Sequence, residues 1–292
     1  MFQGTYTALV TRFQNDRVDE AAFTQLIEAQ IAGGVTGLGP VGTTGESPTL
    51  DHDEHMRVIA LAVEAAGGRT KVIAGTGSNS TREAVEMTVE AEKLGADAAL
   101  LVAPYYNKPS QEGLYRHFAK IAEATKLPLI LYSIPGRCGV EIGIETTARL
   151  AQACPNIVAM KEAGGSVERV SALRAVLPAK FDILSGDDSL TLPFMAAGAV
   201  GVISVASNII PAKVAALVNA ALAGDAAKAR ALHFQLYGLF KDLFIEPNPV
   251  PVKYALSLQG RMAPDVRLPL CEMSDASKAK LTATLRKLSL VA

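Results

Sequence analysis

Lys161 stands out in this chain as a candidate nucleophile. It follows four apolar residues, "IVAM" at 157–160, and a glycine-rich turn, "EAGG", comes directly after it. An apolar run of this kind is typical of a buried strand, so the amine would lie at the edge of a core. Partial desolvation there lowers the pKa of a lysine and leaves a free base that can attack a carbonyl carbon. The strand alone leaves open the alternative, a lysine that ends a strand and extends to water.

The segment "GTTGES" at 42–47 has the composition of an anion-binding turn. Its two glycines let backbone N–H groups converge, and the hydroxyls of Thr43 and Thr44 add two more donors. It is not a phosphate-binding P-loop, because the Lys-Ser/Thr ending is missing. The alternative is a tight turn between a strand and a helix.

Tyrosines and an arginine follow two other apolar runs. Tyr106 ends one run, and Tyr132 lies in another with Arg137 five residues beyond it. A phenol can pass a proton, and a guanidinium can hold a carboxylate through two parallel hydrogen bonds. A single tyrosine would more often only fill the rim of a fold. Two tyrosines beside the lysine and the threonines favour a catalytic site.

Other chemistries find less support. The stretch "HDEH" at 52–55 has a histidine pair that resembles metal ligands, but Asp51 and Glu54 match the cap of a helix instead. We therefore predict no metal site. A phosphate at the end of the run 181–187 would be repelled by Asp187 and Asp188. Among only four histidines, no serine or cysteine triad stands out.

Composition indicates an ordinary globular enzyme. The 292 residues are 49% hydrophobic and 20% charged, and the net charge of −1 gives no attraction to nucleic acid or anionic membrane. The start has no signal-peptide pattern, and the most apolar late stretch is broken by Asn208 and Pro211. The three cysteines, odd in number and far apart, argue against disulfides and predict a cytoplasmic protein: Cys138, Cys154 and Cys271.

The elements that would position these residues alternate along the chain. Near-continuous apolar runs are typical of parallel strands covered on both faces, and amphipathic stretches such as 18–34 and 81–96 separate them. Repeated βα units favour a closed (β/α)8 TIM barrel. An open doubly wound sheet is the alternative, but the glycine-rich dinucleotide motif expected after its first strand is missing. The predicted strands are 4–13, 36–42, 71–77, 98–106, 127–135, 157–163, 181–187 and 201–207.

The barrel is predicted to span residues 1–224 and a C-terminal helical appendage residues 225–292. The appendage would hold three helices and is smaller than most independent domains, so it would pack on the barrel or build an oligomer contact. Active sites of such barrels lie at the C-terminal ends of the strands. The candidate residues stand at those ends, and the first strand offers Thr7 there.

Seven motifs in this order resemble one known family. The chain is similar to the dihydrodipicolinate synthases of the pyruvate-dependent aldolase superfamily, which also includes N-acetylneuraminate lyase. The set is specific for the superfamily, and Arg137 favours the synthases because the sialic-acid lyases lack it. The motifs are "GTTGES" (42–47), "YYN" (105–107), "YSIPGR" (132–137), "KEAGG" (161–165), "SGDD" (185–188), "GVISV" (201–205) and "EPNPVPVK" (246–253).

The resemblance implies a mechanism without metal or organic cofactor. Lys161 would form a Schiff base with pyruvate, whose carboxylate the Thr44 hydroxyl and the backbone of residues 43–44 would hold. The resulting enamine would attack L-aspartate 4-semialdehyde, and Arg137 would bind the carboxylate of that aldehyde. Tyr132 would shuttle protons, with Thr43 and Tyr106 completing the relay. Gly186 and the Ile203 carbonyl would line the pyruvate pocket.

The resemblance also implies regulation and assembly. In the family the counterpart of Tyr106 crosses a dimer interface, so we expect a homo-oligomer, most simply a homotetramer. Feedback inhibition by L-lysine would act at that interface, on Ser47, His52, His55, Asn79, Glu83 and Tyr105. Departures from the common pattern are Pro48, Ser133, Gly136 and Cys138, none of which removes a catalytic group.

The leading hypothesis is therefore a cytoplasmic lyase of diaminopimelate and lysine biosynthesis that yields 4-hydroxy-tetrahydrodipicolinate. Two alternatives stay open. One is another Schiff-base aldolase that acts on a 2-keto-3-deoxy sugar acid. The other is a catalytically silent sensor on the same fold, which would bind pyruvate without consuming a second substrate.

Overall fold

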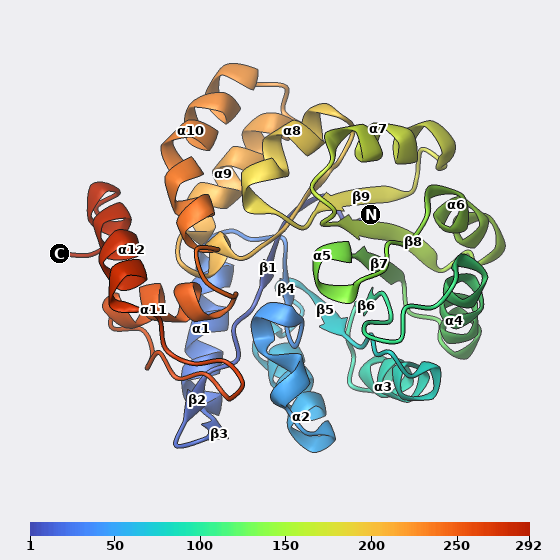
Figure 1. Cartoon of the computed structure of the whole chain (residues 1–292), viewed down its shortest axis with the longest axis horizontal. Coiled ribbons are helices and arrows are strands. Elements are labelled where there is room, and N and C mark those ends of the chain that lie inside the picture. The colour runs from blue at the N-terminus through green and yellow to red at the C-terminus, as the bar shows by residue number, and fades with distance from the viewer.

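The computed structural model describes residues 1–292 and has eight parallel strands in a closed barrel (Figure 1). The barrel closes because the first strand pairs with both the second and the last, with Tyr6 opposite Gly37 and Ile203. The predicted TIM barrel is confirmed. The strands are β1 (Gly4–Ala8), β4 (Gly37–Gly39), β5 (Lys71–Gly75), β6 (Ala98–Val102), β7 (Leu129–Ser133), β8 (Ile157–Glu162), β9 (Asp182–Ser185) and β10 (Gly201–Ser204).

Each predicted strand exists, but the strands end earlier than their apolar runs. The reason is that the loops at the barrel mouth are also apolar and buried. The predicted strand 4–13 ends at Ala8, and its last residue belongs instead to a small hairpin of β2 (Phe13–Gln14) and β3 (Arg17–Val18). The placement of Thr7 at the mouth is wrong: its hydroxyl donates to the Gln30 side chain at 2.8 Å.

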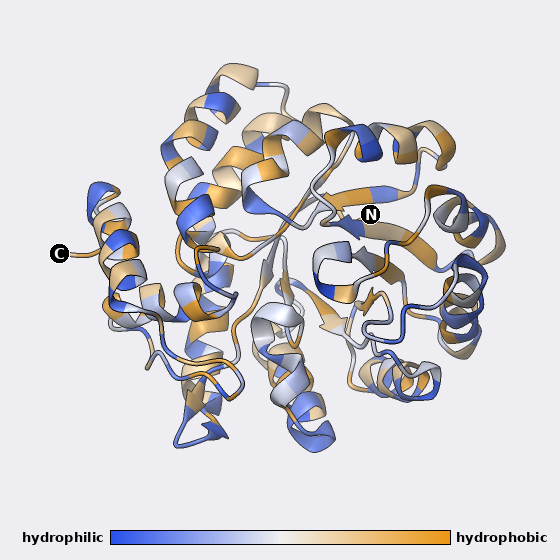
Figure 2. Ribbon diagram, in the orientation of Figure 1, coloured by the Kyte–Doolittle hydropathy of each residue, from blue (hydrophilic) through white to orange (hydrophobic).

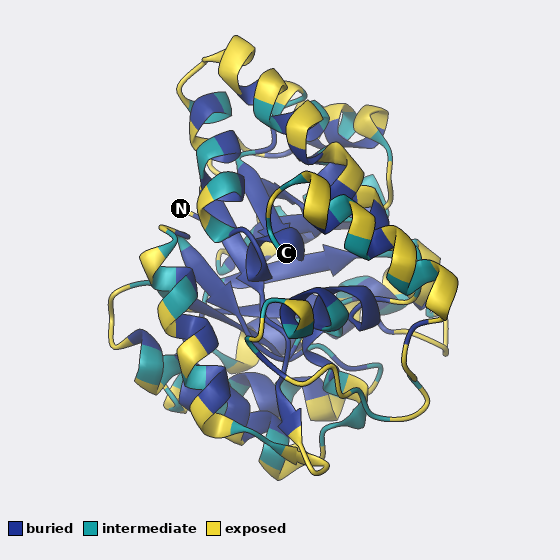
Figure 3. Cartoon of the chain, turned by 90° about the vertical axis from the view of Figure 1, so that its left-hand side faces the viewer, coloured by how far each residue is buried: buried dark blue, intermediate teal, exposed yellow.

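Helices surround the barrel and turn their apolar sides toward it (Figure 2). Buried residues concentrate in the strands and the inner helix faces, and exposed ones lie on the outside (Figure 3). No helix is both long and apolar enough to cross a membrane. The helices of the barrel are α1 (Glu20–Ala32), α2 (His52–Ala66), α3 (Thr81–Lys93), α4 (Gln111–Ala124), α5 (Pro135–Cys138), α6 (Ile144–Ala153), α7 (Val167–Val176), α8 (Thr191–Ala196) and α9 (Pro211–Leu222).

Three further helices follow the barrel: α10 (Ala226–Asp242), α11 (Val250–Leu258) and α12 (Asp275–Lys287). They lie against the side formed by α9 and α1 (Figure 1). Leu236 of α10 and Leu256 of α11 are buried in the same hydrophobic cluster as Leu26 of α1 and Val202 of β10. The C-terminal segment thus shares a hydrophobic core with the barrel through α10 and α11, and α12 packs on the outside of these two helices.

Candidate active site

Lys161 and Tyr132 lie side by side at the C-terminal ends of β8 and β7. The two residues are paired in the strand register, and the Lys161 Nζ lies 4.1 Å from the centre of the Tyr132 ring. Only 6% of Lys161 and 4% of Tyr132 are exposed. The strand pairing therefore brings the predicted nucleophile and the predicted proton carrier into direct contact in a nearly dry site.

The electrostatic surroundings favour an uncharged amine. Burial lowers the pKa of Lys161 to about 7, with nearby Asp188 opposing the shift and Arg137 adding to it. Near neutral pH a far larger share of this amine is therefore a free base than of an exposed lysine. Burial also raises the pKa of Tyr132 to about 12, so that its phenol keeps its proton at neutral pH. A free amine beside a protonated phenol is suited to imine chemistry on a carbonyl compound.

The turn after β4 forms one wall of the site. Thr43 and Thr44 begin a 3-10 turn, and the Thr44 side chain is almost fully buried. A cavity of about 240 Å³ lies against it. Thr43, Tyr132 and Arg137 line this cavity together with Cys138.

Of the two predicted pocket residues, Gly186 lies beside the lysine side chain and Ile203 lies inside the barrel. A Cβ atom on Gly186 would come within 3.1 Å of the Lys161 Cε, so glycine leaves the space that the lysine chain occupies. Ile203 of β10 is 2% exposed and belongs to the cluster inside the barrel that also contains Tyr132.

Tyr106 is separated from the other candidate catalytic residues within this chain. Its side chain is 90% exposed, and its φ of +73° lies in the left-handed region that few non-glycine residues adopt. The neighbouring Tyr105 lines the cavity, whereas Tyr106 does not. One protomer thus assembles the lysine, the buried tyrosine, the threonines and the arginine but leaves the exposed tyrosine outside.

The residues proposed for L-lysine lie between the cavity and α3. Ser47 and Tyr105 line the cavity, and the Asn79 amide donates to the Tyr105 carbonyl at 3.1 Å. The Glu83 carboxylate accepts a hydrogen bond from Ser78. The two histidines differ: the His55 Nε2 is 2.7 Å from the buried Gly75 carbonyl, whereas His52 is half exposed and pairs with Glu90 at 3.1 Å.

The "HDEH" stretch begins α2, and the capping interpretation is confirmed. The Asp51 carboxylate accepts from the Glu54 N–H, and the Glu54 carboxylate accepts from the Asp51 N–H. These side chains are thus committed to the helix end. No three His, Cys, Asp or Glu side chains gather where they would hold a metal ion.

The two acids that were expected to repel a phosphate, Asp187 and Asp188, differ in their surroundings. Asp188 turns inward, where its carboxylate accepts from the Ser204 hydroxyl and from the Val205 and Ala206 N–H groups. Burial raises its pKa to about 6. Sequence reasoning missed its effect on Lys161, because the carboxylate comes from a different strand end.

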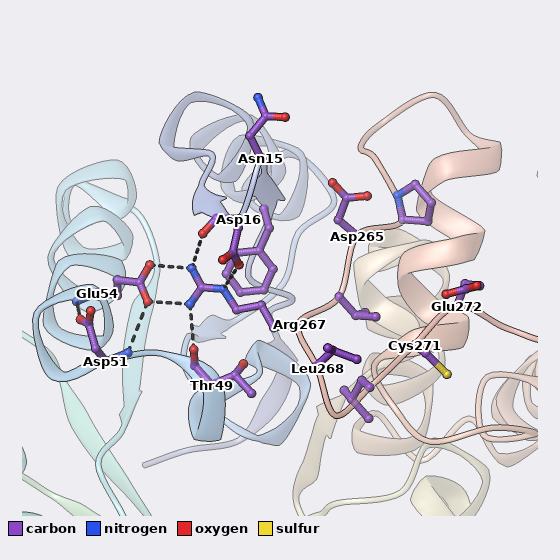
Figure 4. Close-up of a pocket in the computed structure, with 14 residues that line it drawn as sticks. Asn15, Asp16, Thr49, Asp51, Glu54, Asp265, Arg267, Leu268, Cys271 and Glu272 are labelled. Carbon is purple, nitrogen blue, oxygen red and sulfur yellow. Dashed lines mark hydrogen bonds and ion pairs between the residues drawn. The ribbon is translucent and has the colours of Figure 1, made fainter.

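A larger groove of about 1120 Å³ lies outside the barrel, between the β2–β3 hairpin, the start of α2 and residues 264–272 (Figure 4). Arg267 reaches across it and pairs with Glu54 at 2.6 Å and Asp16 at 2.9 Å. Its charge is thus already compensated, and none of the predicted catalytic residues lies there. The groove lies at the contact between the C-terminal segment and the rest of the molecule, and Arg267 links the two sides.

Comparison with known proteins identifies the family. Residues 1–288 match the dihydrodipicolinate synthetase family. This chain belongs to that family. It is 55% identical over 291 residues to the 4-hydroxy-tetrahydrodipicolinate synthase of Geotalea daltonii, with 100% of both chains covered. It is 51% identical over 290 residues, 99% of each chain, to the synthase of Aquifex aeolicus.

Solved structures of the dihydrodipicolinate synthetase family agree with this assignment. The 4-hydroxy-tetrahydrodipicolinate synthase of Methylacidiphilum fumariolicum SolV superposes with a TM-score of 0.98 at 54% identity, covering 99% of this chain and 96% of the other. A relative from Cyanidioschyzon merolae, solved with lysine bound, has a TM-score of 0.96 at 40% identity over 99% of both chains. The chain is accordingly an aldolase-like lyase, of a family that works through a lysine Schiff base with pyruvate and uses no separate cofactor.

Proposed function

We propose that this enzyme condenses pyruvate with L-aspartate 4-semialdehyde and releases 4-hydroxy-tetrahydrodipicolinate. The observation that carries the proposal is the buried amine of Lys161, with its pKa lowered to about 7, packed against the ring of Tyr132. Arg137, which lines the same cavity as Tyr132, would supply a cation for the carboxylate of the second substrate.

Each residue has a distinct task in the proposed reaction. The Lys161 amine attacks the keto carbon of pyruvate, and water leaves to give a protonated imine. The imine withdraws electrons, so a methyl proton is lost and an enamine forms, whose carbon attacks the aldehyde. The amino group of the semialdehyde then attacks the imine carbon and displaces the Lys161 amine, which closes the ring, releases the product and restores the free lysine. Tyr132 donates and takes back protons near the imine, and Thr43 connects it toward Tyr106. Thr44 would hold the pyruvate carboxylate, with Gly186 and the Ile203 carbonyl around it.

A steady-state assay tests this function directly. Both substrates are supplied, and purified dihydrodipicolinate reductase with NADPH reports the product. Turnover that depends on both substrates supports the proposal. The proposal would be wrong if the coupling enzyme is active and no turnover is seen. Cleavage of a 2-keto-3-deoxy sugar acid would then show that the chain has the other aldolase activity.

The lowered pKa of Lys161 predicts a pH dependence. Below pH 7 most of the amine is ammonium, which cannot attack a carbonyl, so kcat/KM for pyruvate should rise with pH. It should level off above about pH 7, because the pKa is lowered to about 7. Initial rates from pH 5.5 to 9.5 measure this. A rate that is still rising at pH 9.5 would show that the lysine titrates near its ordinary value.

We further propose that the active form is a homotetramer, a dimer of dimers, in the cytoplasm. Tyr106 supports an oligomer, because its ring is 90% exposed in a single chain and would be covered if a neighbouring protomer packed against it. The cysteines are all free, which fits a reducing compartment. Sedimentation velocity is expected to give about four times the 30.6 kDa of one chain, and a single-chain species with full activity would contradict it.

Inhibition by L-lysine is the regulatory part of the proposal. Glu83 is expected to pair with an ammonium group of lysine, near Ser47, His52, His55, Asn79 and Tyr105. A relative of this family was solved with lysine bound, which supports the assignment. Loss of a charge-assisted hydrogen bond is worth about 10- to 100-fold in binding, so Glu83→Ala should raise the inhibitory concentration by that factor.

The matched control is Glu86→Ala, which removes an exposed carboxylate from the same helix. It should leave the response to lysine unchanged. Initial rates against L-lysine concentration distinguish the variants. If the initial rate of the native enzyme stays constant up to tens of millimolar L-lysine, the regulatory proposal is wrong and the catalytic proposal is unaffected.

A further inference from the structure

The segment 246–253, "EPNPVPVK", has no task in the mechanism so far, although it reaches the active site. It joins α10 to α11, and its residue Asn248 is only 5% exposed. The Asn248 amide nitrogen donates to the Thr44 hydroxyl oxygen at 2.9 Å. Its backbone carbonyl accepts from the Arg137 guanidinium at 3.4 Å. One residue of the C-terminal segment thus touches both groups that are proposed to bind substrate carboxylates.

The direction of the bond between Asn248 and Thr44 has a chemical consequence. A threonine hydroxyl has one proton to donate and two lone pairs that accept. Because the amide donates to the Thr44 oxygen, the threonine proton is free to point at another acceptor. A carboxylate can only accept hydrogen bonds. If the Thr44 hydroxyl donated its proton to Asn248 instead, only its lone pairs would face the carboxylate, and these would repel it.

A buried ion pair holds the same two segments together beside this contact. Lys253 pairs with Glu46, two residues after Thr44, and their side chains are 0% and 1% exposed. The Arg267 N–H also donates to the Glu46 carboxylate at 3.0 Å. Glu46 has a φ of +55°, in the left-handed region, so these contacts fix a turn that would otherwise be disfavoured. The amide of Asn248 is thereby held in one place relative to Thr44.

We propose that Asn248 is a positioning residue, which directs the Thr44 hydroxyl proton toward the carboxylate of the keto acid. The inference rests on the proposed function, since it takes the pyruvate carboxylate as the ligand of Thr44. Asn248 does not touch the reacting atoms. It acts through the threonine, and its backbone carbonyl independently steadies Arg137.

The test is Asn248→Asp, which keeps the size of the side chain and replaces the donor by an acceptor. Thr44 must then donate to the aspartate, so the KM for pyruvate should rise about 10- to 100-fold. The KM for the semialdehyde should change less than about threefold, because the backbone carbonyl beside Arg137 is unchanged. Asn248→Ala, which removes the donor without adding charge, should raise the pyruvate KM by a smaller factor.

A double-mutant cycle separates positioning from a structural role. In a Thr44→Val background, Asn248→Ala should add little to the pyruvate KM if Asn248 acts through the threonine hydroxyl, whereas the negative charge of Asn248→Asp repels the keto acid in either background. Three results would overturn the inference. The first is that Thr44→Val and Asn248→Ala raise the pyruvate KM additively. The others are an equal rise in the KM values of both substrates, and a wild-type pyruvate KM in both single Asn248 variants. Borohydride trapping of pyruvate on the native enzyme is the separate check on the proposed function. If no adduct is trapped, the proposed function is wrong, whatever the KM values of the Asn248 variants are.

Discussion

Replacing Lys161 with alanine is expected to lower turnover by on the order of 10⁴-fold or more, because the covalent intermediate can no longer form. Borohydride reduction in the presence of pyruvate should add about 72 Da to the native chain and nothing to Lys161→Ala, since only an imine is trapped. Mass spectrometry of the intact chain and the coupled assay measure the two results on the same samples.

Two controls make this result specific. Lys161→Arg keeps a positive charge in the site but offers no amine nucleophile, so it should be as inactive as the alanine variant. Lys180→Ala removes an exposed lysine and should keep both the rate and the adduct. Trapping of pyruvate on Lys161→Ala would show that a different amine performs the chemistry.

The largest expected effect on stability comes from the ion pair of Lys253 and Glu46. Lys253→Met leaves the Glu46 carboxylate buried without its cation, which typically costs about 3–5 kcal/mol. Urea unfolding followed by circular dichroism should show a clearly lower midpoint. A Lys253→Met, Glu46→Leu double variant should recover part of the loss, because no uncompensated charge remains. Recovery stays incomplete because Lys253 also donates to the Asp265 carbonyl.

The matched control is Lys120→Met. Lys120 pairs with Glu123 at 3.1 Å, and both side chains are 67% exposed. Exposed pairs contribute about 0–1 kcal/mol, so this variant should unfold near the native midpoint. If Lys253→Met were equally mild, the buried pair would have no special part in holding the C-terminal segment.

The sequence was sufficient to predict the barrel and to show that most candidate residues stand at the ends of its strands, for physical reasons. Strands covered on both faces must be apolar throughout, so their runs are visible without any structure. Strand ends were less predictable, because mouth loops such as residues 9–12 are buried too. The error at Thr7 has the same origin: a continuous apolar run has no alternation to tell which side chains face the inside.

What the sequence could not predict depends on contacts between distant segments. Asn248 meets Thr44 across 204 positions, and a single hydrogen bond of that range leaves no periodicity to detect. Asp188 was recognised as an acid, but its burial and its influence on Lys161 depend on the closure of the barrel. The separate position of Tyr106 was expected only from the family resemblance, since its exposure cannot be deduced from residue type.

The link between Thr44 and Asn248 also bears on how the protein matures as it is synthesised. Chains leave the ribosome from the N-terminus at about 5–20 residues per second, so the threonine waits roughly 10–40 s for its partner. β1 and β4 are made before that interval, β10, which closes the barrel, is made within it, and the segment that carries Asn248 is made only at its end. A nascent chain stalled before residue 248 would therefore carry Lys161 and Tyr132 with an incomplete carboxylate site. If Thr44 and Asn248 hold the keto acid as proposed, the chain becomes able to bind it only near the end of translation.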